Sequence, residues 1–259
     1  AGDGTGTGSV RWALQAPETE TGVGSHYADG QLVVPFGLSM DVEAHPCVPS
    51  VEFSGAPGAG LPSVTHERAV IVNQATMRRA LQATWSAGAY CNRRITEGIS
   101  WNVEDLSPVW EEVSRLGADS DVTLRLWPET MPTLMAQEDD DGVEILVDAG
   151  LWTLELMGVR EGAVVRLATL RMRLEITSDL DVANDGSIWL NPTATAVTAL
   201  GTADGLLRAP DLEMAQALAP VLSERLVASA PVGWLPSLPG FGSARVRMSG
   251  AHLVFFSQE

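Results

Sequence analysis

The clearest pattern in this sequence is a long alternation of apolar and polar residues over positions 168–182. One set of alternate positions is apolar apart from Ser178, and the other set is polar or charged. Because successive side chains of a strand point to opposite faces, this pattern predicts a strand about 50 Å long, at about 3.3 Å per residue, with one dry and one wet face. The dry face would carry Ala168, Leu170, Met172, Leu174, Ile176, Leu180 and Val182.

A second strand is expected just before this one, and it contains a change of parity near Gly150. A bulge at that point would shift the register by one residue and keep both apolar sets on one face. Those sets are Val143, Ile145 and Val147, followed by Trp152, Leu154 and Leu156. Further strand patterns cover 31–43, 51–53, 70–72, 95–105, 121–127, 187–200 and 244–256.

Two segments have helical periodicity instead. The first, 73–90, begins with Asn73 as a suitable N-cap and repeats Met77, Leu81 and Trp85 every four residues. In the second, 211–229, Pro220 predicts either a kink or a division into two short helices. Its apolar stripe is Leu212, Ala215, Ala219, Leu222 and Leu226, flanked by Met214, Leu218 and Val221. With a shorter helix expected at 108–116, the chain is predicted to be α+β.

Composition and charge exclude several classes of function for this chain. A chain of 259 residues with 45% hydrophobic content can bury a sizeable core, and no run approaches the roughly eighteen apolar residues that cross a bilayer. The formal charge of −17 opposes binding to nucleic acid and to anionic lipid surfaces. All 16 basic residues are arginine, so mechanisms that need a lysine, such as Schiff-base formation or phosphate binding by a P-loop, are excluded.

The two cysteines, Cys47 and Cys91, suggest a disulfide if the protein is exported. Closing that loop would contribute roughly 3 to 4 kcal/mol on the chain-entropy model, and two buried free thiols are the alternative. Residues 1–9 have the composition of a flexible linker, and such a segment would suit a protein tethered to a membrane by a lipidated residue upstream.

Catalytic and metal-binding signatures are missing. The histidines His26, His45, His66 and His252 are scattered singly, so no metal site is expected, and neither a nucleophile elbow nor a nucleotide-binding loop occurs. The acidic run at 138–141 could bind calcium, but an acidic hairpin turn explains it equally well. We therefore expect no enzyme activity and no cofactor.

Three segments taken in order resemble a family of known proteins. They are 70–91, a strand leading into a helix that ends in Trp-Ser-Ala-Gly; 123–134, Thr-Leu-Arg-Leu-Trp-Pro-Glu-Thr-Met-Pro-Thr-Leu; and the second helix with Leu-Pro-Ser-Leu-Pro-Gly-Phe at 235–241 and the closing strand at 244–256. Their order and spacing are similar to the carboxy-terminal barrel of the bactericidal/permeability-increasing protein and lipopolysaccharide-binding protein family, the tubular lipid-binding (TULIP) group.

The resemblance implies a long, highly twisted antiparallel sheet wrapped around one long helix, with a second helix and an apolar tube for a lipid. It covers about 31–259 as a single barrel domain, which leaves 1–30 as a flexible linker and edge segment. The best-known members of the family pair two barrels, so a homodimer would be one way to complete this one. The acidity of the chain departs from the cationic surface of endotoxin binders and argues against recognition of lipopolysaccharide.

We expect a non-enzymatic lipid-binding or lipid-transfer protein of the bacterial envelope, either periplasmic, tethered to the outer membrane or secreted. Its ligand would be a phospholipid, a fatty acid or a sterol-like lipid. The alternatives are an envelope scaffold module with a solid core and no ligand, and a lipid hydrolase with a serine or aspartate beside a histidine. The residues expected to line the cavity are Met77, Leu81, Trp85, Trp152, Leu154, Leu170, Met172, Leu174, Ile176, Met214, Leu218, Val221 and Leu222.

Overall fold

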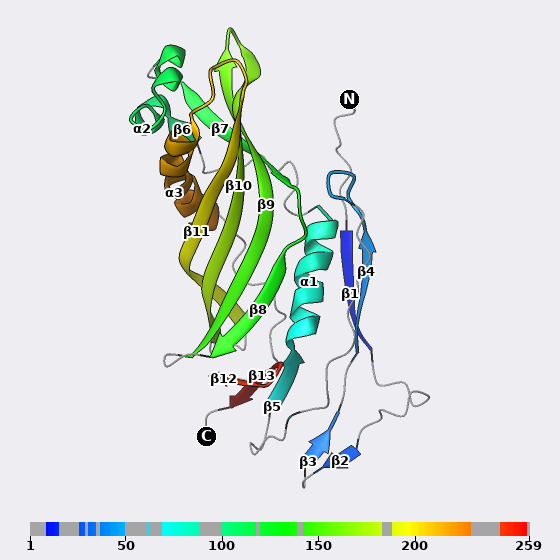
Figure 1. Cartoon of the computed structure of the whole chain (residues 1–259). Coiled ribbons are helices and arrows are strands. Elements are labelled where there is room, and N and C mark those ends of the chain that lie inside the picture. Colours follow the sequence, from blue (N-terminus) through cyan, green and yellow to red (C-terminus); the bar gives the residue numbers. More distant parts are fainter. Residues whose placement is uncertain are drawn as a thin grey trace.

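A six-stranded antiparallel sheet is the largest element of the fold, seen in a computed structural model (Figure 1). The long strands β9 (Val143–Arg160), β10 (Ala163–Val182) and β11 (Ile188–Asp204) pair in the order β11, β10, β9. β7 (Asp121–Pro128) and β8 (Thr133–Glu138) pair with different halves of β9, and β6 (Ser100–Asn102) pairs with β7. The structure describes residues 9–15, 26–28, 31–34, 37–49, 62, 69–88, 100–117, 120–138, 142–182, 188–228 and 244–257.

The burial of β10 confirms the alternation predicted from the sequence. Leu170, Met172 and Leu174 are buried, whereas Arg171 and Arg173 between them are exposed. The strand has 20 residues, so its dry face extends well beyond that of an ordinary strand. Hydrophobic burial along this one face therefore determines how the sheet packs.

The bulge predicted near Gly150 is confirmed. The register between β9 and β10 shifts where Leu174 pairs with Gly150 and Glu175 pairs with Asp148. Gly150 has a φ of +78°, a backbone conformation that glycine adopts without strain. On the other side of β9, the connection from β7 to β8 lies next to this bulge. The amide of Glu129 in that connection donates to the Leu151 carbonyl of β9 at 2.8 Å. We call this bend in the sheet the corner.

Two main helices pack beside the sheet in different places. α1 (Gln74–Ser86) lies next to β8, and its N-cap Asn73 accepts a hydrogen bond from the Ala75 amide at 2.7 Å, as the sequence predicted. α3 (Leu212–Ala228) lies against β11, with Asp211 accepting from the Met214 amide at 2.9 Å. Figure 1 shows the two helices well separated, so the wrapping of the sheet around one long helix is not confirmed.

Smaller elements complete the described structure. One three-stranded sheet has the order β12, β13, β5 and lies near the lower end of the long sheet in Figure 1. Two-stranded pairs are formed by β1 with β4 and by β2 with β3. These elements are β1 (Ser9–Gln15), β2 (His26–Ala28), β3 (Gln31–Val33), β4 (Gly37–Glu43), β5 (Ala69–Asn73), β12 (Ala244–Ser249), β13 (His252–Ser257), α2 (Val103–Leu106) and a 3-10 helix (Glu111–Leu116).

Several predicted elements differ from the observed ones. The single strand expected at 244–256 is a hairpin, β12 and β13, that turns at Gly250 with φ +58°. In the segment 95–105, where a strand was expected, the described residues 100–105 form β6 and then enter α2. The second helix, α3, continues through Pro220 as one helix. Trp189, in the strand expected at 187–200, is 41% exposed because it pairs with Asp181, on the wet face of β10.

Three predictions depend on segments that are only partly described. β1 pairs with β4 across the expected boundary at residues 30 and 31, and the division into a linker and one barrel domain stays a prediction. Cys47 lies in the turn after β4 and Cys91 lies outside the described residues, so the bridge between them stays a prediction. β8 and β9 form the expected hairpin, whose residues 139–141 are outside the described part, and no cluster of metal ligands occurs among the described side chains.

Among the helices in the described part of the chain, none is both long enough and apolar enough to cross a membrane.

Candidate functional site

The dry face of the long sheet is covered by two separate packed cores. The α3 core brings the C-terminal part of β9, the first half of β10 and β7 together with Ala215 and Leu218 of α3. The α1 core brings β8, the start of β9 and the end of β10 together with Met77 and Leu81 of α1. The sheet is therefore held from two ends by two different helices.

The interval between the two cores is packed less completely. Val147 contacts both cores but is only partly buried, and so are Ile176 and Val197 in the neighbouring strands. By contrast, Ile145 and Leu174, two residues away along the strands, are 0% and 7% exposed. The apolar face is thus least well covered at the level just before the corner.

A hollow of about 310 Å³ lies at this level, across β9, β10 and β11. Its lining follows three consecutive rows of residues that pair across the strands. Such a volume is at the lower end of the range of small-molecule sites, about 300 to 1,000 Å³. Row by row, the lining residues are Asp148, Glu175 and Ala196; Val147, Ile176 and Thr195; and Leu146 and Thr177.

The hollow combines apolar surface with a small charged group. Side chains of successive rows point to opposite faces of the sheet, so Leu146 and Ala196 lie on the face that carries Asp148 and Glu175, whereas Val147 and Ile176 belong to the dry face. Arg173 donates from Nη2 to Asp148 at 2.6 Å and lies 3.2 Å through Nε from Glu175. Hydrogen bonding to Asp148 raises the pKa of Arg173, with the charges of Asp148 and Glu175 acting in the same direction. The arrangement can bind an apolar chain but presents carboxylates beside it.

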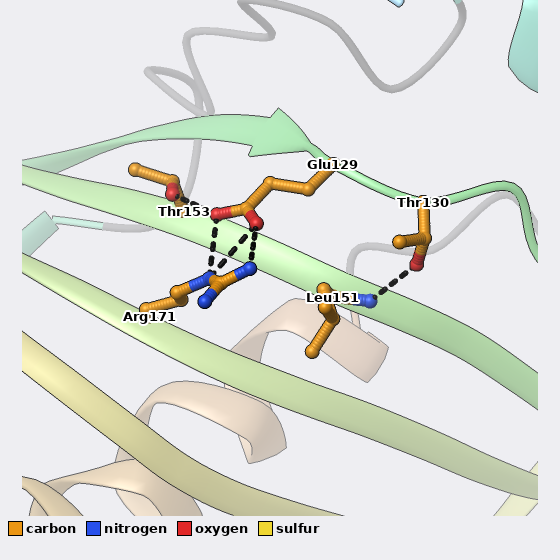
Figure 2. Close-up of polar contacts among 5 residues, drawn as sticks. All are labelled: Glu129, Thr130, Leu151, Thr153 and Arg171. Carbon is orange, nitrogen blue, oxygen red and sulfur yellow. Dashed lines mark hydrogen bonds and ion pairs between the residues drawn. The ribbon is translucent and has the colours of Figure 1, made fainter. Parts of the chain in front are cut away.

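The corner determines where the charged group lies. The second carboxylate oxygen of Asp148, Oδ1, accepts the Gly150 amide at 3.0 Å, which links the side chain to the bulge. The Leu151 amide donates to Thr130 Oγ1 at 2.8 Å, as Figure 2 shows. Asp148 is therefore fixed between the bulge and Arg173.

A second ion pair lies on the same strands beyond the corner. In Figure 2, the carboxylate of Glu129 faces the guanidinium of Arg171, whose Nη2 is 2.6 Å from Glu129 Oε2, and Thr153 donates to the other carboxylate oxygen. The hydrogen bond from Arg171 holds the pKa of Glu129 below its ordinary value, although burial acts in the opposite direction. This network joins the β7–β8 connection to β9 and β10 and does not line the hollow.

The two histidines whose side chains are described have structural contacts. His45 Nδ1 accepts the Cys47 amide at 3.1 Å, and His252 Nε2 lies 3.2 Å from Asn73 Nδ2. Neither contact joins the histidine to a serine or an aspartate, which is the arrangement that a hydrolase would need.

The residues predicted to line a cavity lie in several different places. Ile176 lines the hollow, and Met214 is 43% exposed on α3. Val221 and Leu222 belong to the part of α3 whose side chains lie outside the described residues. The others are buried: Trp152, Leu154, Leu170, Met172, Leu174 and Leu218 in the α3 core, Met77 and Leu81 in the α1 core, and Trp85 on α1. Their contact with a ligand stays a prediction.

Sequence reasoning missed seven of the eight residues of the hollow as site residues, Ile176 being the exception. Val147 was assigned to the dry face, but nothing in its local pattern separates it from Ile145, which is fully buried. Asp148, Glu175 and Thr177 occupy polar positions of alternating strands and have no distinguishing neighbours in the sequence. The site depends on cross-strand register and on where the two cores end.

Comparisons with known proteins give only a distant likeness. No protein-family model matches the chain, and no curated protein matches its sequence. The structure is similar to the crystal structure of lipopolysaccharide binding protein, with a TM-score of 0.37 and 15% sequence identity. The match covers 77% of this chain and 45% of that one, so this chain spans less than half the length of the protein it resembles.

Proposed function

We propose that this protein is a non-enzymatic lipid-binding protein that holds the hydrocarbon chain of its ligand in the hollow across β9, β10 and β11. The observation that carries this proposal is the interval between the two packed cores. There, Val147 and Ile176 stay only partly buried on the dry face, and their strands also form a hollow of about 310 Å³. An incompletely covered apolar surface favours a hydrocarbon ligand, because each methylene removed from water contributes about 0.8 kcal/mol.

Lipid transfer, a location outside the cytoplasm and a distant relationship to the tubular lipid-binding family are parts of the same proposal. They are supported by the order of the sequence segments and by the long antiparallel strands with one dry face. The buried residues of the α3 core and α1 core would contact the ligand only if the two cores separate to admit a longer chain. Among the predicted residues, Ile176 belongs to the lining of the hollow, which supports this part of the proposal.

Binding of Nile red, an uncharged fluorescent hydrophobic probe, tests the proposal on the intact chain. We expect a blue-shifted emission in the presence of the protein. Ala196→Trp would fill the hollow from β11 and should weaken binding by about tenfold or more, equivalent to about 1.4 kcal/mol. The matched control is Ala203→Trp, another exposed alanine of β11 outside the hollow, which should bind as the wild type does.

Either of two results would contradict the proposal: no probe binding by the folded wild type, or equal binding by the Ala196→Trp variant. Extraction of the purified protein with organic solvent, followed by mass spectrometry, provides a second measurement. Recovery of a bound lipid in reproducible amount is the expected result.

A scaffold module with a solid core is a second candidate, and the packing of the two cores favours it. Four residues of the α3 core are at most 8% exposed, as in a filled interior: Trp152, Leu154, Leu170 and Met172. Such a protein would bind neither Nile red nor any other hydrophobic probe. The same titration therefore separates the two candidates.

A further inference from the structure

The three-stranded sheet of β12, β13 and β5 has two different faces. One face packs in the α1 core through alternate residues of each strand, among them Met248, Leu253 and Val72. Because neighbouring residues of a strand point to opposite sides, the residues between them point away from that core. We call this second side the arginine face, since it carries two arginines and no acidic residue. Its residues are Ala69, Ile71, Asn73, Arg245, Arg247, Ser249, His252, Val254 and Phe256.

Arg247 lies over an aromatic ring on this face. Its guanidinium carbon, Cζ, is 5.6 Å from the centre of the Phe256 ring, within the range of about 6 Å for a cation–π contact. The Nε atom of Arg247 is buried and has no hydrogen-bond acceptor among the described residues. The residue as a whole is half-buried, so a small group can approach its guanidinium from the solvent.

The lack of a carboxylate beside Arg247 is unusual in this chain. The sequence has 33 acidic and only 16 basic residues, and Arg115, Arg171 and Arg173 each lie 2.6 Å from a carboxylate oxygen. In the part of the chain that the structure describes, Arg247 forms no such ion pair. A half-buried guanidinium with an unused donor has lost hydration without gaining a hydrogen bond, and a bound anion would offset that cost.

We propose that Arg247 binds a phosphate group at the arginine face. The planar guanidinium has N–H donors that match two phosphate oxygens, and such charge-assisted bonds are about twice as strong as neutral ones. Arg245 is exposed two residues earlier on the same face, and the two positive charges match the charge of a phosphate monoester, about −1.5 to −2 at pH 7. A carboxylate, with one charge, matches less well. The site shares no residue with the hollow, so it goes beyond the proposed lipid-binding function and does not depend on it.

The net charge of the chain is compatible with this site. A formal charge of −17 opposes an extended anionic surface, but one small anion interacts mainly with charges within a Debye length, about 8 Å at 0.15 M ionic strength. On the arginine face those charges are Arg245 and Arg247. Glu138 also approaches β12, but its carboxylate accepts the Met248 amide at 3.1 Å and forms no ion pair with Arg247. A single phosphate group therefore binds where an anionic membrane surface would be repelled.

Titration of the intact chain with inorganic phosphate, at pH 7 and constant ionic strength, tests the proposal. The side-chain Nε–H signals of the arginines are followed by NMR, and the Arg247 signal is identified by its absence from an Arg247→Lys variant. We expect this signal to shift with phosphate concentration until the site is saturated. The signals of Arg171 and Arg173, which already have carboxylate partners, should not shift.

Two variants of Arg247 and one control identify the binding residue, with affinity measured by calorimetry. Arg247→Gln removes the charge and most of the donors and should weaken phosphate binding about tenfold or more. Arg247→Lys keeps the charge but loses the planar arrangement of donors, and it should weaken binding about threefold or more. Arg115→Gln removes an exposed arginine that is paired with Glu112 and should bind phosphate as the wild type does. Urea unfolding of each variant checks that folded proteins are being compared.

The phosphate could be a free anion or part of a lipid headgroup, and a second titration distinguishes them. It uses dihexanoylphosphatidic acid, a phosphate monoester with two short chains, below its micelle concentration. Affinity no greater than that of inorganic phosphate supports a site for free anions, whereas binding about tenfold tighter or more supports a headgroup site. A phosphate shift that does not saturate, or equal weakening by Arg247→Gln and Arg115→Gln, overturns the proposal. Neither result affects the proposed lipid-binding function, because Nile red binding tests the hollow and not the arginine face.

Discussion

Gly150 has a φ of +78°, and a side chain at this position would overlap the hydroxyl of Thr130. That hydroxyl accepts the Leu151 amide at 2.8 Å, so any movement of Thr130 also breaks a hydrogen bond at the corner. Gly162, in the turn between β9 and β10, has the same φ of +78° but open space around it. Alanine variants at the two positions therefore distinguish the cost of backbone strain, which both would have, from the cost of steric overlap, which only Gly150→Ala would have.

Gly150→Ala should therefore lower the free energy of unfolding more than Gly162→Ala does. The left-handed conformation alone costs an alanine about 1 to 2 kcal/mol, and Gly162→Ala should show that loss only. Gly150→Ala should lose about 1 to 3 kcal/mol more, through the displaced Thr130 and its hydrogen bond. Urea unfolding of both variants measures the difference, and equal losses would show that Thr130 adjusts without cost.

Glu129 gives the corner a dependence on pH. Its pKa is lowered from the ordinary value of 4.5, chiefly by the hydrogen bond from Arg171. A carboxylate with a lowered pKa in the folded state stabilises the fold above its unfolded pKa, and this contribution disappears as pH falls through the folded pKa. Glu129→Gln should destabilise the protein at pH 7 by at most about 1 kcal/mol, the range of exposed ion pairs.

The difference between the wild type and Glu129→Gln should shrink as the pH falls below 4.5, because protonation removes the same charge from the wild type. Urea unfolding at a series of pH values measures it. Asp179→Asn, at an exposed position of β10, provides the baseline for losing a carboxylate without this contact. A constant difference at every pH would show that Glu129 acts through packing rather than charge.

Two outer strands of the long sheet, β11 and β8, are each bound by a glutamine of a neighbouring helix. Gln216 of α3 accepts the Ala199 amide and donates to the Val197 carbonyl of β11, each at 2.9 Å. Gln74 of α1 makes the same pair of contacts with the amide and carbonyl of Ala136 in β8, each at 3.3 Å. A side-chain amide here replaces the peptide group of a further strand, which protects edges that would otherwise pair with other chains.

Gln216→Ala should expose the backbone of β11 and lower stability by about 1 kcal/mol, the usual contribution of such hydrogen bonds. Hydrogen exchange at the Ala199 amide should become faster than in the wild type, whereas amides in the centre of β10 should change little. Glu213→Ala, at an exposed position one turn earlier in α3, is the control. Unchanged exchange at Ala199 would show that α3 covers the edge without help from Gln216.

The elements that the sequence predicted well are those with a strong local signal. The alternation over 168–182 was sufficient for β10, and the change of parity was sufficient for the bulge at Gly150, because both follow from the period of a strand. The exposure of Trp189 was not predictable in this way, since it depends on pairing with Asp181 across two strands. The hollow was even less predictable from local patterns, because it forms only when eight residues from three strands pair in the observed register.

The charge of the whole chain makes a prediction about salt. A formal charge of −17 at pH 7 destabilises the compact state by self-repulsion, and added salt reduces this repulsion as the Debye length falls from about 30 Å at 0.01 M to about 8 Å at 0.15 M. Salt also weakens surface ion pairs such as that of Arg171 with Glu129, but each contributes at most about 1 kcal/mol. We therefore expect the repulsion to dominate and the melting temperature to rise with salt.

A rise of about 2 to 4 °C between these salt concentrations corresponds to about 1 kcal/mol for a chain of this size. Calorimetry at pH 7 measures it, and sodium chloride is preferred because strongly excluded salts such as sulfate stabilise most proteins in other ways. The effect should shrink as the pH is lowered toward the sequence pI of about 4.5, where the net charge approaches zero. A fall in melting temperature with salt at pH 7 would mean that the ion pairs along β9 and β10 stabilise the fold more than the net charge destabilises it.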